Sequence, residues 1–466
     1  MFHWTGTILT TSLHKRWCKK VANMKRALKV EIQGREIIKP SHPTPHHLRN
    51  LELSLLDQTN YSLYVCTCFL YKVNNNVKAD QVSQRLKSSL SETLTKFYPF
   101  AGRVKDDFSI ECNDEGVEFI DGRADGFLSE YLQNPDQKLL TEFQPFGGKG
   151  DPIAGKGPLL ILQVTFFKCG GVAITTLSSH KLIDALSSSI FISCWAAVAR
   201  GEFRKAVVPE FVAASIFPPS ESFVPFPTHF SPAESNRFVF DASKLAQLQA
   251  EVASASVPRP SRVEALTALI WKCARTASRS NRGFARPSLL VQAVNLRSVV
   301  VPPLSENSVG NSIGFMPAQT SEKEMELQEL VCKLRKAKDE FSNNVKQTLL
   351  ETKSILNVSE STRDKFERDE IDFFSFTSMI SFPVHEGADF GWGKPINVTF
   401  PNYTTPNVVI LVSTEDGAGI EAFVYLSPED MPIFERSQEL LSFATLNPPV
   451  QVNEKEKGSF ASKSSL

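Results

Sequence analysis

The feature that most limits how this chain can fold is a run of six prolines between residues 209 and 232, near its midpoint. Proline fixes φ and lacks a backbone N–H, so a segment this rich in proline cannot continue a helix or a central strand. We therefore expect residues 209–232 to form an extended crossover, partly polyproline II, between two halves. The length of 466 residues allows two or three domains at roughly 150 residues each, and the crossover favours two.

The predicted organisation follows from this crossover. Residues 24–208 form an N-terminal domain, residues 233–455 a C-terminal domain and residues 456–466 a flexible tail. Residues 1–23 are an uncertain leader, because the first 30 residues contain seven Lys or Arg and no acidic residue. That bias resembles a transit peptide. We favour the alternative that translation starts at Met24, because the residues that follow resemble an ordinary domain start.

Helix-like and strand-like segments mix in both halves, which predicts an α/β or α+β fold. Residues 80–97 place apolar side chains at nearly every fourth position, as an amphipathic helix does. Residues 159–168 and 172–178 predict a buried hairpin, and residues 185–199 a buried helix. Ser261 begins an S-x-x-E capping box, which predicts the start of a helix. Further strands are expected within 51–72 and at 108–111, 117–120, 288–295, 373–381, 406–413 and 419–426, and further helices at 241–253, 322–345 and 427–443.

Composition excludes several classes of function. The 51 Lys+Arg balance 51 Asp+Glu, so the basic excess typical of a nucleic-acid binder is missing. A chain with 42% hydrophobic residues and no net charge is not disordered. No apolar stretch reaches about 18 uncharged residues, so no transmembrane helix and no membrane partner are expected. Eight scattered cysteines without a C-x-x-C pair indicate reduced thiols in a cytoplasmic protein rather than a metal site.

His180 stands apart among the histidines because it ends an apolar strand just before the helix predicted at 185–199. Rigid elements hold a side chain well at such a junction. Asp184 follows four residues later, which gives an H-x-x-x-D pattern. One interpretation is a catalytic histidine. The other is a core histidine with Asp184 as a helix cap, and the spacing alone leaves both open.

A second segment of interest is Asp389-Phe390-Gly391-Trp392-Gly393. Two glycines around a tryptophan indicate a tight backbone path that locks an aromatic ring. On physical grounds we interpret this segment as a structural turn.

Together these segments resemble the plant BAHD acyltransferases, which use coenzyme A thioesters. His180–Asp184 is similar to the family's H-x-x-x-D, and Asp389–Gly393 is identical to its D-F-G-W-G. Other family landmarks occur in the family's order from about Val30 onward: LSLLDQ (53–58), YPFAGR (98–103), Asn295 and Arg297, Pro302-Pro303-Leu304, and Gly310-Asn311. The segment SHKLIDA (179–185) is most similar to that of the alkaloid and terpenoid acetyltransferase branch.

Three positions depart from the family pattern. Ala185 follows Asp184, at a position where the family usually has glycine. The alkaloid and terpenoid branch also has alanine there. Met379 replaces the tryptophan of the family's T-S-W, which puts an indole contact to the acyl or acceptor group in question. Val299 replaces an arginine often found two residues after Arg297.

The resemblance implies a fold of two chloramphenicol-acetyltransferase-like domains, each a mixed sheet with flanking helices, with an active-site channel between them. It implies acetyl transfer from acetyl-CoA to a hydroxyl of a plant alkaloid or terpenoid. It also implies that the transfer takes place in a ternary complex without an acyl-enzyme. Alternatives are a malonyl, benzoyl or other acyl donor, a volatile alcohol acceptor, or a non-catalytic binding homologue that would have lost His180 or the cleft. Acyl-CoA is then a co-substrate, and a monomer without bound cofactor or metal is expected.

The resemblance also assigns roles to the two motifs. His180 would be the general base, since imidazole titrates near working pH. Asp184 would pair with Arg297 as structural support. Asp389 is often counted as catalytic in the family, but we expect it, with the rest of the D-F-G-W-G segment (Gly391, Trp392 and Gly393), to be structural.

Two further sets of residues are candidates for substrate contacts by the same resemblance. Thr377 would donate a hydrogen bond to the oxyanion. Ser261 and Arg262, at a capped helix start, would bind CoA phosphates, because helix N-termini favour anions. The alternative for Ser261 is a capping role alone.

Overall fold

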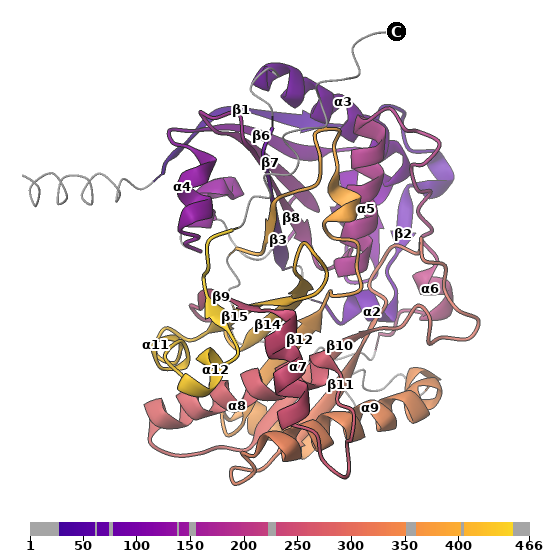
Figure 1. Ribbon diagram of the computed structural model, residues 1–466. Coiled ribbons are helices and arrows are strands. Elements are labelled where there is room, and N and C mark those ends of the chain that lie inside the picture. The colour runs from indigo at the N-terminus through magenta and orange to yellow at the C-terminus, as the bar shows by residue number, and fades with distance from the viewer. Residues whose placement is uncertain are drawn as a thin grey trace, which may run out of the picture.

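A computed structural model describes residues 28–450 except 61–62, 74–77, 138, 149–154, 222–229, 351–359 and 402–404. The predicted leader (1–23), the tail (456–466) and part of the predicted crossover lie outside the described residues. Each half of the chain contributes most of one large mixed sheet, and the two sheets lie one above the other in Figure 1.

The first sheet has six strands. The pair β6 and β7 is parallel and the other pairs are antiparallel, so the sheet is mixed as predicted. A small separate sheet of three strands lies in the same half. In spatial order the large sheet contains β1 (Val30–Ile38), β6 (Val117–Ala124), β7 (Leu160–Phe166), β8 (Val172–Ser179), β3 (Tyr64–Tyr71) and β13 (Asn397–Thr399), and the small sheet β2 (Asn50–Glu52), β5 (Ser109–Glu111) and β4 (Arg103–Val104).

Two long helices cover one face of the first sheet (Figure 1). Helix α3 (Ala79–Lys96) buries Val82, Leu86, Leu90 and Leu94 along one stripe, as its spacing predicts. Helix α5 (Ala185–Ala199) begins and ends at the predicted residues and is apolar nearly all round, because it is enclosed by its neighbours. The shorter helices of this half are α2 (Leu55–Gln58), α4 (Leu128–Gln133) and α6 (Ala213–Ile216).

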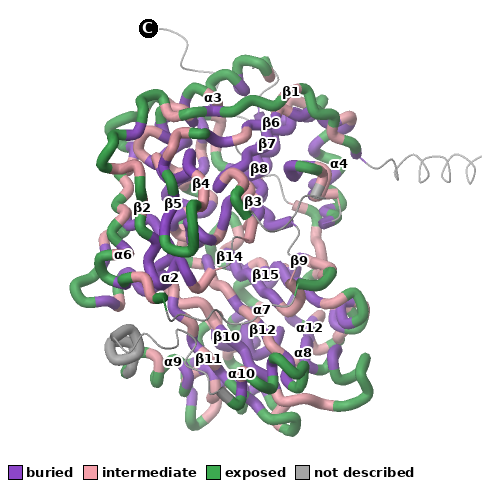
Figure 2. The backbone as a smooth tube through the Cα atoms, turned by 180° about the vertical axis from the view of Figure 1, so that it is seen from behind, coloured by how far each residue is buried: buried purple, intermediate pink, exposed green. Residues whose placement is uncertain are grey.

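The second sheet has seven strands. The pairs β10–β12 and β12–β14 are parallel and the remaining pairs are antiparallel. In spatial order it contains β11 (Ile313–Thr320), β10 (Ser288–Asn295), β12 (Asp372–Ser378), β14 (Val408–Ser413), β15 (Ile420–Leu426), β9 (Glu234–Phe240) and β16 (Thr445–Leu446). Figure 2 shows buried chain concentrated in central strands such as β6, β7 and β15, whereas the edge strand β1 is mostly exposed.

The longest helices of the second half are α7 (Ala242–Glu251), α8 (Arg262–Arg282) and α9 (Leu327–Leu350), with α10 (Glu360–Glu367), α11 (Met431–Phe434) and α12 (Gln438–Leu441). Helix α8 starts at Ser261 through the predicted capping box with Glu264. It ends at Gly283, whose φ of 81° suits glycine. Within the described residues, no helix combines the length and the apolar character needed to cross a bilayer.

Some local predictions were wrong. The single helix expected at 427–443 is two short helices, because Ser437 caps a new one by accepting a hydrogen bond from Leu440 N. Residues 51–72 contain a helical turn as well as strands, since Ser54 and Asp57 form a capping box that starts α2. Strands β1, β9 and β11 do not follow from the periodicity of the sequence.

One segment of the second half crosses to the first half. Strand β13 belongs to the C-terminal half of the sequence but pairs with β3 at the edge of the first sheet. In Figure 1 the orange chain before it lies beside α5, among indigo and magenta elements. Phe390 and Phe400 pack in the same core as residues of α3 and α5. A linear boundary at 209–232 therefore does not describe where this segment packs.

Candidate active site

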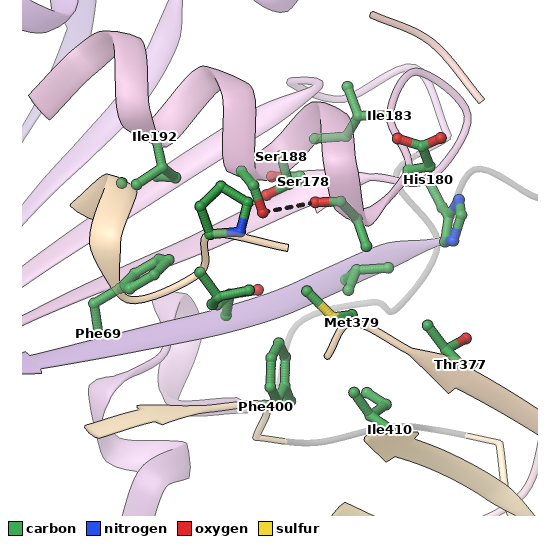
Figure 3. Close-up of a pocket in the computed structure, with 18 residues that line it drawn as sticks. Phe69, Ser178, His180, Ile183, Ser188, Ile192, Thr377, Met379, Phe400 and Ile410 are labelled. Carbon is green, nitrogen blue, oxygen red and sulfur yellow. Dashed lines mark hydrogen bonds between the residues drawn. The ribbon is translucent and has the colours of Figure 1, made fainter. Parts of the chain in front are cut away.

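A cavity of about 780 Å³, including its open mouth, lies between the two sheets. Figure 3 shows His180 and Thr377 at one end of it, and Phe69 and Ile192 at the other. Its wall is largely apolar with a few hydroxyl groups. The lining residues are Val65, Thr67, Phe69, Ser178, His180, Ile183, Asp184, Ala185, Ser188, Ser189, Ile192, Thr377, Met379, Pro383, Val384, Gly387, Phe400 and Ile410.

The regular elements explain which side chains reach the cavity. Strand β3 contributes Val65, Thr67 and Phe69, which alternate along the strand and therefore share one face. Helix α5 contributes residues 185, 188, 189 and 192, which lie on one side of a helix at this spacing. Thr377 from β12 faces the cavity beside Ile410, its register partner on β14.

His180 lies directly after the last residue of β8 and is partly buried. Its backbone N–H donates to Leu63 O at 2.7 Å, which continues the β3–β8 ladder up to the histidine. Its Nδ1 lies 3.1 Å from Asn311 Oδ1. The imidazole is thus held by a strand end on one side and by a side chain from the second half on the other.

Asp184 forms a buried ion pair with Arg297, and both side chains are almost inaccessible to solvent. The distances are 2.8 Å from Nη1 to Oδ2 and 3.2 Å from Nη2 to Oδ1, a bidentate arrangement. Asp184 also accepts from Ser187 N at 2.8 Å, which caps α5, and from Ser312 N at 3.0 Å. Burial by itself raises the pKa of Asp184, but Arg297 and these N–H groups hold that pKa below its ordinary value.

Arg297 also donates hydrogen bonds to the surrounding backbone and to a side chain of α5. Its Nε donates to Ser308 O at 3.0 Å, and its Nη2 donates to Gly310 O at 3.1 Å and Ser187 Oγ at 3.0 Å. Asp184 contributes atoms to the cavity wall. Its carboxylate is nevertheless neutralised, so His180 is the ionisable group on the described wall that is not committed to an ion pair.

The D-F-G-W-G segment does not line the cavity. Asp389 Oδ1 accepts from Gly391 N at 2.8 Å and Gly393 N at 3.0 Å, which closes a tight turn. Gly391 and Gly393 have φ of 99° and 100°, a region that favours glycine.

The aromatic side chains of this turn pack on the first half of the molecule. Trp392 stacks on Phe390 and meets Tyr71 edge to face, with ring centroids 5.8 and 5.9 Å apart. The Arg85 guanidinium lies 4.7 Å from the Trp392 ring. Arg200 donates to the Asp389 carbonyl.

Ser261 and Arg262 are at the start of α8, away from the described cavity wall. Ser261 Oγ accepts from Glu264 N at 3.2 Å, and Arg262 donates to Ala418 O at 2.8 Å. The Glu264 carboxylate accepts from Ser261 N and pairs with Arg335. A carboxylate of the chain itself therefore occupies part of this helix N-terminus.

The sequence patterns do not identify two parts of the site. Pro383, Val384 and Gly387 form one wall, although they belong to the segment that crosses to the first half. Asn311 contacts His180 directly, although the sequence marks Gly310-Asn311 only as a family landmark. No cluster of His, Cys, Asp or Glu suited to a metal ion occurs among the described residues.

Comparison with known proteins identifies the family of this chain. Residues 28–441 match the Transferase family. The chain is 37% identical over 431 residues to 17,18-epoxy-17-hydroxycur-19-ene N-malonyltransferase of Strychnos nux-vomica, covering 90% of this chain and 91% of that protein. It is 36% identical over 459 residues to limonoid 7-O-acetyltransferase of Citrus sinensis, covering 90% and 98%.

A solved structure supports the same assignment. The crystal structure of vinorine synthase, an enzyme of Rauvolfia serpentina, matches with a TM-score of 0.76 at 31% identity. The match covers 91% of this chain and all of that chain (100%). The predicted two-domain fold and the predicted enzyme class are thereby confirmed. The chain belongs to the Transferase family and is a BAHD acyltransferase, of a family that uses acyl-CoA as co-substrate.

Proposed function

We propose that this enzyme transfers an acetyl group from acetyl-CoA to a hydroxyl of a plant alkaloid or terpenoid, with His180 as general base. One observation carries the proposal: the described cavity wall contains two ionisable side chains, and one of them, Asp184, is neutralised by Arg297. His180 is the remaining group that can take a proton there.

The proposed reaction takes place in a ternary complex of enzyme, acyl-CoA and acceptor. The imidazole of His180 removes the proton of the acceptor hydroxyl while its oxygen attacks the thioester carbonyl carbon. The tetrahedral intermediate carries the negative charge on the former carbonyl oxygen, and Thr377 on the cavity wall donates a hydrogen bond to it. The C–S bond then breaks, and the CoA thiolate takes the proton from the imidazolium.

Asp184 and Asp389 are structural in this proposal. Asp184 supports the segment between β8 and α5 through Arg297. Asp389 closes the D-F-G-W-G turn outside the described cavity wall, so it has no access to the reacting atoms in this mechanism.

The cavity wall favours a neutral acyl group. Its described lining contains no Lys or Arg to pair with the second carboxylate of a malonyl group, and a buried unpaired charge is costly. The relative named as a malonyltransferase supports the alternative donor. A panel of acyl-CoAs against hydroxylated alkaloids and triterpenoids, read by product mass, separates the two, and we expect acetyl product in excess.

His180→Ala tests the proposed base. We expect turnover to fall by about 10²–10⁴-fold, the usual contribution of a general base, while acyl-CoA binding is retained. His47→Ala is a matched control, because His47 is exposed and does not line the cavity. Unchanged turnover of His180→Ala would contradict the role of His180.

Three further assignments belong to this proposal. The Ser261 hydroxyl and the Arg262 guanidinium bind a CoA phosphate at the start of α8, supported by the helix N-terminus they share. The enzyme acts in the cytoplasm, supported by seven free cysteines among the described residues, and as a monomer. Light scattering of the purified chain tests the monomer.

A further inference from the structure

Three side chains that are far apart in the sequence form a continuous hydrogen-bonded chain that ends at His180 on the cavity wall. Asp57 of α2 accepts from Asn311 Nδ2 at 2.9 Å, and Asn311 Oδ1 lies 3.1 Å from His180 Nδ1. Asn311 is fully buried and Asp57 is nearly so. The chain links both halves of the molecule, because Asn311 precedes β11 of the second sheet.

We propose that Asn311 is a positioning residue: its side-chain carbonyl accepts the Nδ1–H of His180 and so keeps Nε2 unprotonated, while Asp57 fixes the orientation of Asn311. This proposal rests on the proposed role of His180 as general base. It identifies the residues that determine which ring nitrogen of His180 can remove a proton from the acceptor.

The orientation of the Asn311 amide follows from its partners. Its Nδ2 donates to two acceptors, Asp57 Oδ1 at 2.9 Å and the His180 carbonyl at 2.8 Å. A rotated amide would place its oxygen against these two oxygens and leave the His180 carbonyl without a donor. Oδ1 is therefore the atom that faces the His180 ring.

The orientation of Asn311 determines the tautomer of His180. An amide oxygen can only accept a hydrogen bond, so Nδ1 of His180 must donate. A neutral imidazole carries one N–H, which leaves Nε2 with its lone pair. Nε2 has no hydrogen-bond partner among the described residues, and the ring lines the cavity. This nitrogen is the one free to remove a proton from an acceptor.

Asp57 is suited to hold the amide because its carboxylate is saturated with donors. It accepts from Ser54 N at 2.8 Å, Ser54 Oγ at 2.6 Å and Asn311 N at 2.8 Å, in addition to Asn311 Nδ2. Burial raises the pKa of Asp57, and the hydrogen bonds from Ser54 and Asn311 act in the opposite direction. Both the backbone and the side chain of Asn311 are thus fixed by one carboxylate.

The same chain connects His180 to the Asp184–Arg297 pair. Gly310, just before Asn311, has φ of 134°, and its carbonyl accepts from Arg297 Nη2 at 3.1 Å. Ser187 Oγ donates to the same carbonyl at 3.0 Å. The ion pair therefore sets the backbone on which Asn311 sits, and it acts on the histidine through Asn311.

Histidine-selective ¹⁵N labelling of the full chain reads the tautomer without substrate. The His180 signals are those lost in His180→Ala. At a pH where the imidazole is neutral, we expect a protonated Nδ1 and an unprotonated Nε2 in the unmodified protein. A His180 that is protonated at Nε2 overturns the proposal.

Variants at position 311 test whether Asn311 determines the tautomer of His180. In Asn311→Ala, the His180 ring should no longer be restricted to the Nδ1–H tautomer. We expect kcat to fall by about 10²-fold, within the range for a general base, with KM for acyl-CoA unchanged. Asn311→Asp keeps an acceptor for Nδ1–H but faces Asp57, so it should keep the tautomer at a lower melting temperature. Ser312→Ala is the control, since its hydroxyl is buried without a partner among the described residues.

Failure of the positioning role of Asn311 can be distinguished from failure of the proposed acyltransferase function. If Asn311→Ala keeps both the tautomer and kcat, the positioning role is wrong even in an active acyltransferase. If no acyl-CoA yields product with any acceptor, the proposed function fails, while the tautomer measurement on the unmodified protein still tests the contact with Asn311.

Discussion

At the residue scale, the Asp184–Arg297 pair illustrates how a buried charge can be structural although it stands near a general base. Arg297 donates to Asp184 and to two carbonyls of the segment 308–310. Asp184 also accepts from one N–H at the start of α5 and from another just before β11. Removing one partner leaves the other charged and unpaired in the interior.

We therefore predict that Asp184→Ala lowers the free energy of unfolding by about 3–5 kcal/mol. Urea unfolding followed by circular dichroism measures the change. Glu340→Gln is the control, because Glu340 pairs with Lys336 on the surface, where both side chains are largely exposed, and should change stability by less than about 0.5 kcal/mol. A stable Asp184→Ala protein that has lost turnover alone would assign Asp184 a chemical role instead.

Asp389 is the second residue whose role the geometry separates from catalysis. We predict that Asp389→Ala mainly reduces the yield of folded protein, because two N–H groups of the D-F-G-W-G turn lose their acceptor, at about 0.5–1.5 kcal/mol for each hydrogen bond. Melting temperature and kcat per folded molecule are measured together. A well-folded variant with a selective loss of kcat would contradict this assignment.

At the element scale, the start of α8 combines a cap with an ion pair. Ser261→Ala removes the side-chain acceptor for Glu264 N and should cost about 1 kcal/mol. If Ser261 also binds a CoA phosphate, KM for acyl-CoA rises in the same variant. An unchanged KM with lower stability would leave capping as its sole role.

The same cap predicts a pH dependence of stability. Burial raises the pKa of Glu264, but hydrogen bonds from Arg335 and Ser261 outweigh burial and lower that pKa to about 2. A depressed pKa in the folded state means that this stabilisation is present above the unfolded value of 4.5 and is lost as pH falls toward 2.

Glu264→Gln should therefore lose less stability than the unmodified protein between pH 5 and 3, in unfolding experiments at both pH values. Glu340→Gln again serves as control, since Glu340 lies on the exposed face of α9. Equal losses in the Glu264→Gln and unmodified proteins would show that Glu264 does not contribute to the acid sensitivity.

At the scale of the whole molecule, the segment that crosses from the second half to the first makes the two halves interdependent. Strand β13 completes the first sheet, and Phe390 and Trp392 cover Tyr71 of β3. The core around α3 and α5 also includes Val408 and Phe423 of the second sheet. Neither half buries its apolar surface without residues of the other.

We predict that the chain unfolds in one cooperative transition and that a fragment of residues 28–221 does not fold alone. Calorimetry of the full chain and circular dichroism of the fragment measure these properties. Two resolved transitions, or a fragment with a cooperative melt of its own, would show that β13 and Phe390 are dispensable for the first half.

The sequence by itself determined the elements whose signals are local. Helix α3 follows from its periodicity, helix α5 and the hairpin β7–β8 follow from continuous apolar runs, and the start of α8 follows from its capping box. Each of these signals depends on neighbours a few residues apart. The position of His180 at a strand end follows from the same local pattern, and the H-x-x-x-D and D-F-G-W-G landmarks are contiguous in the chain.

The tertiary structure alone decided which distant segments meet. Asn311 lies 131 residues from His180 and 254 residues from Asp57, so no local pattern could predict their hydrogen bonds. Strand β13 joins the first sheet across the predicted domain boundary for the same reason. Strand pairing and buried polar contacts are selected by the whole packed core, in which each unpaired polar group is costly, and not by the residues adjacent in sequence.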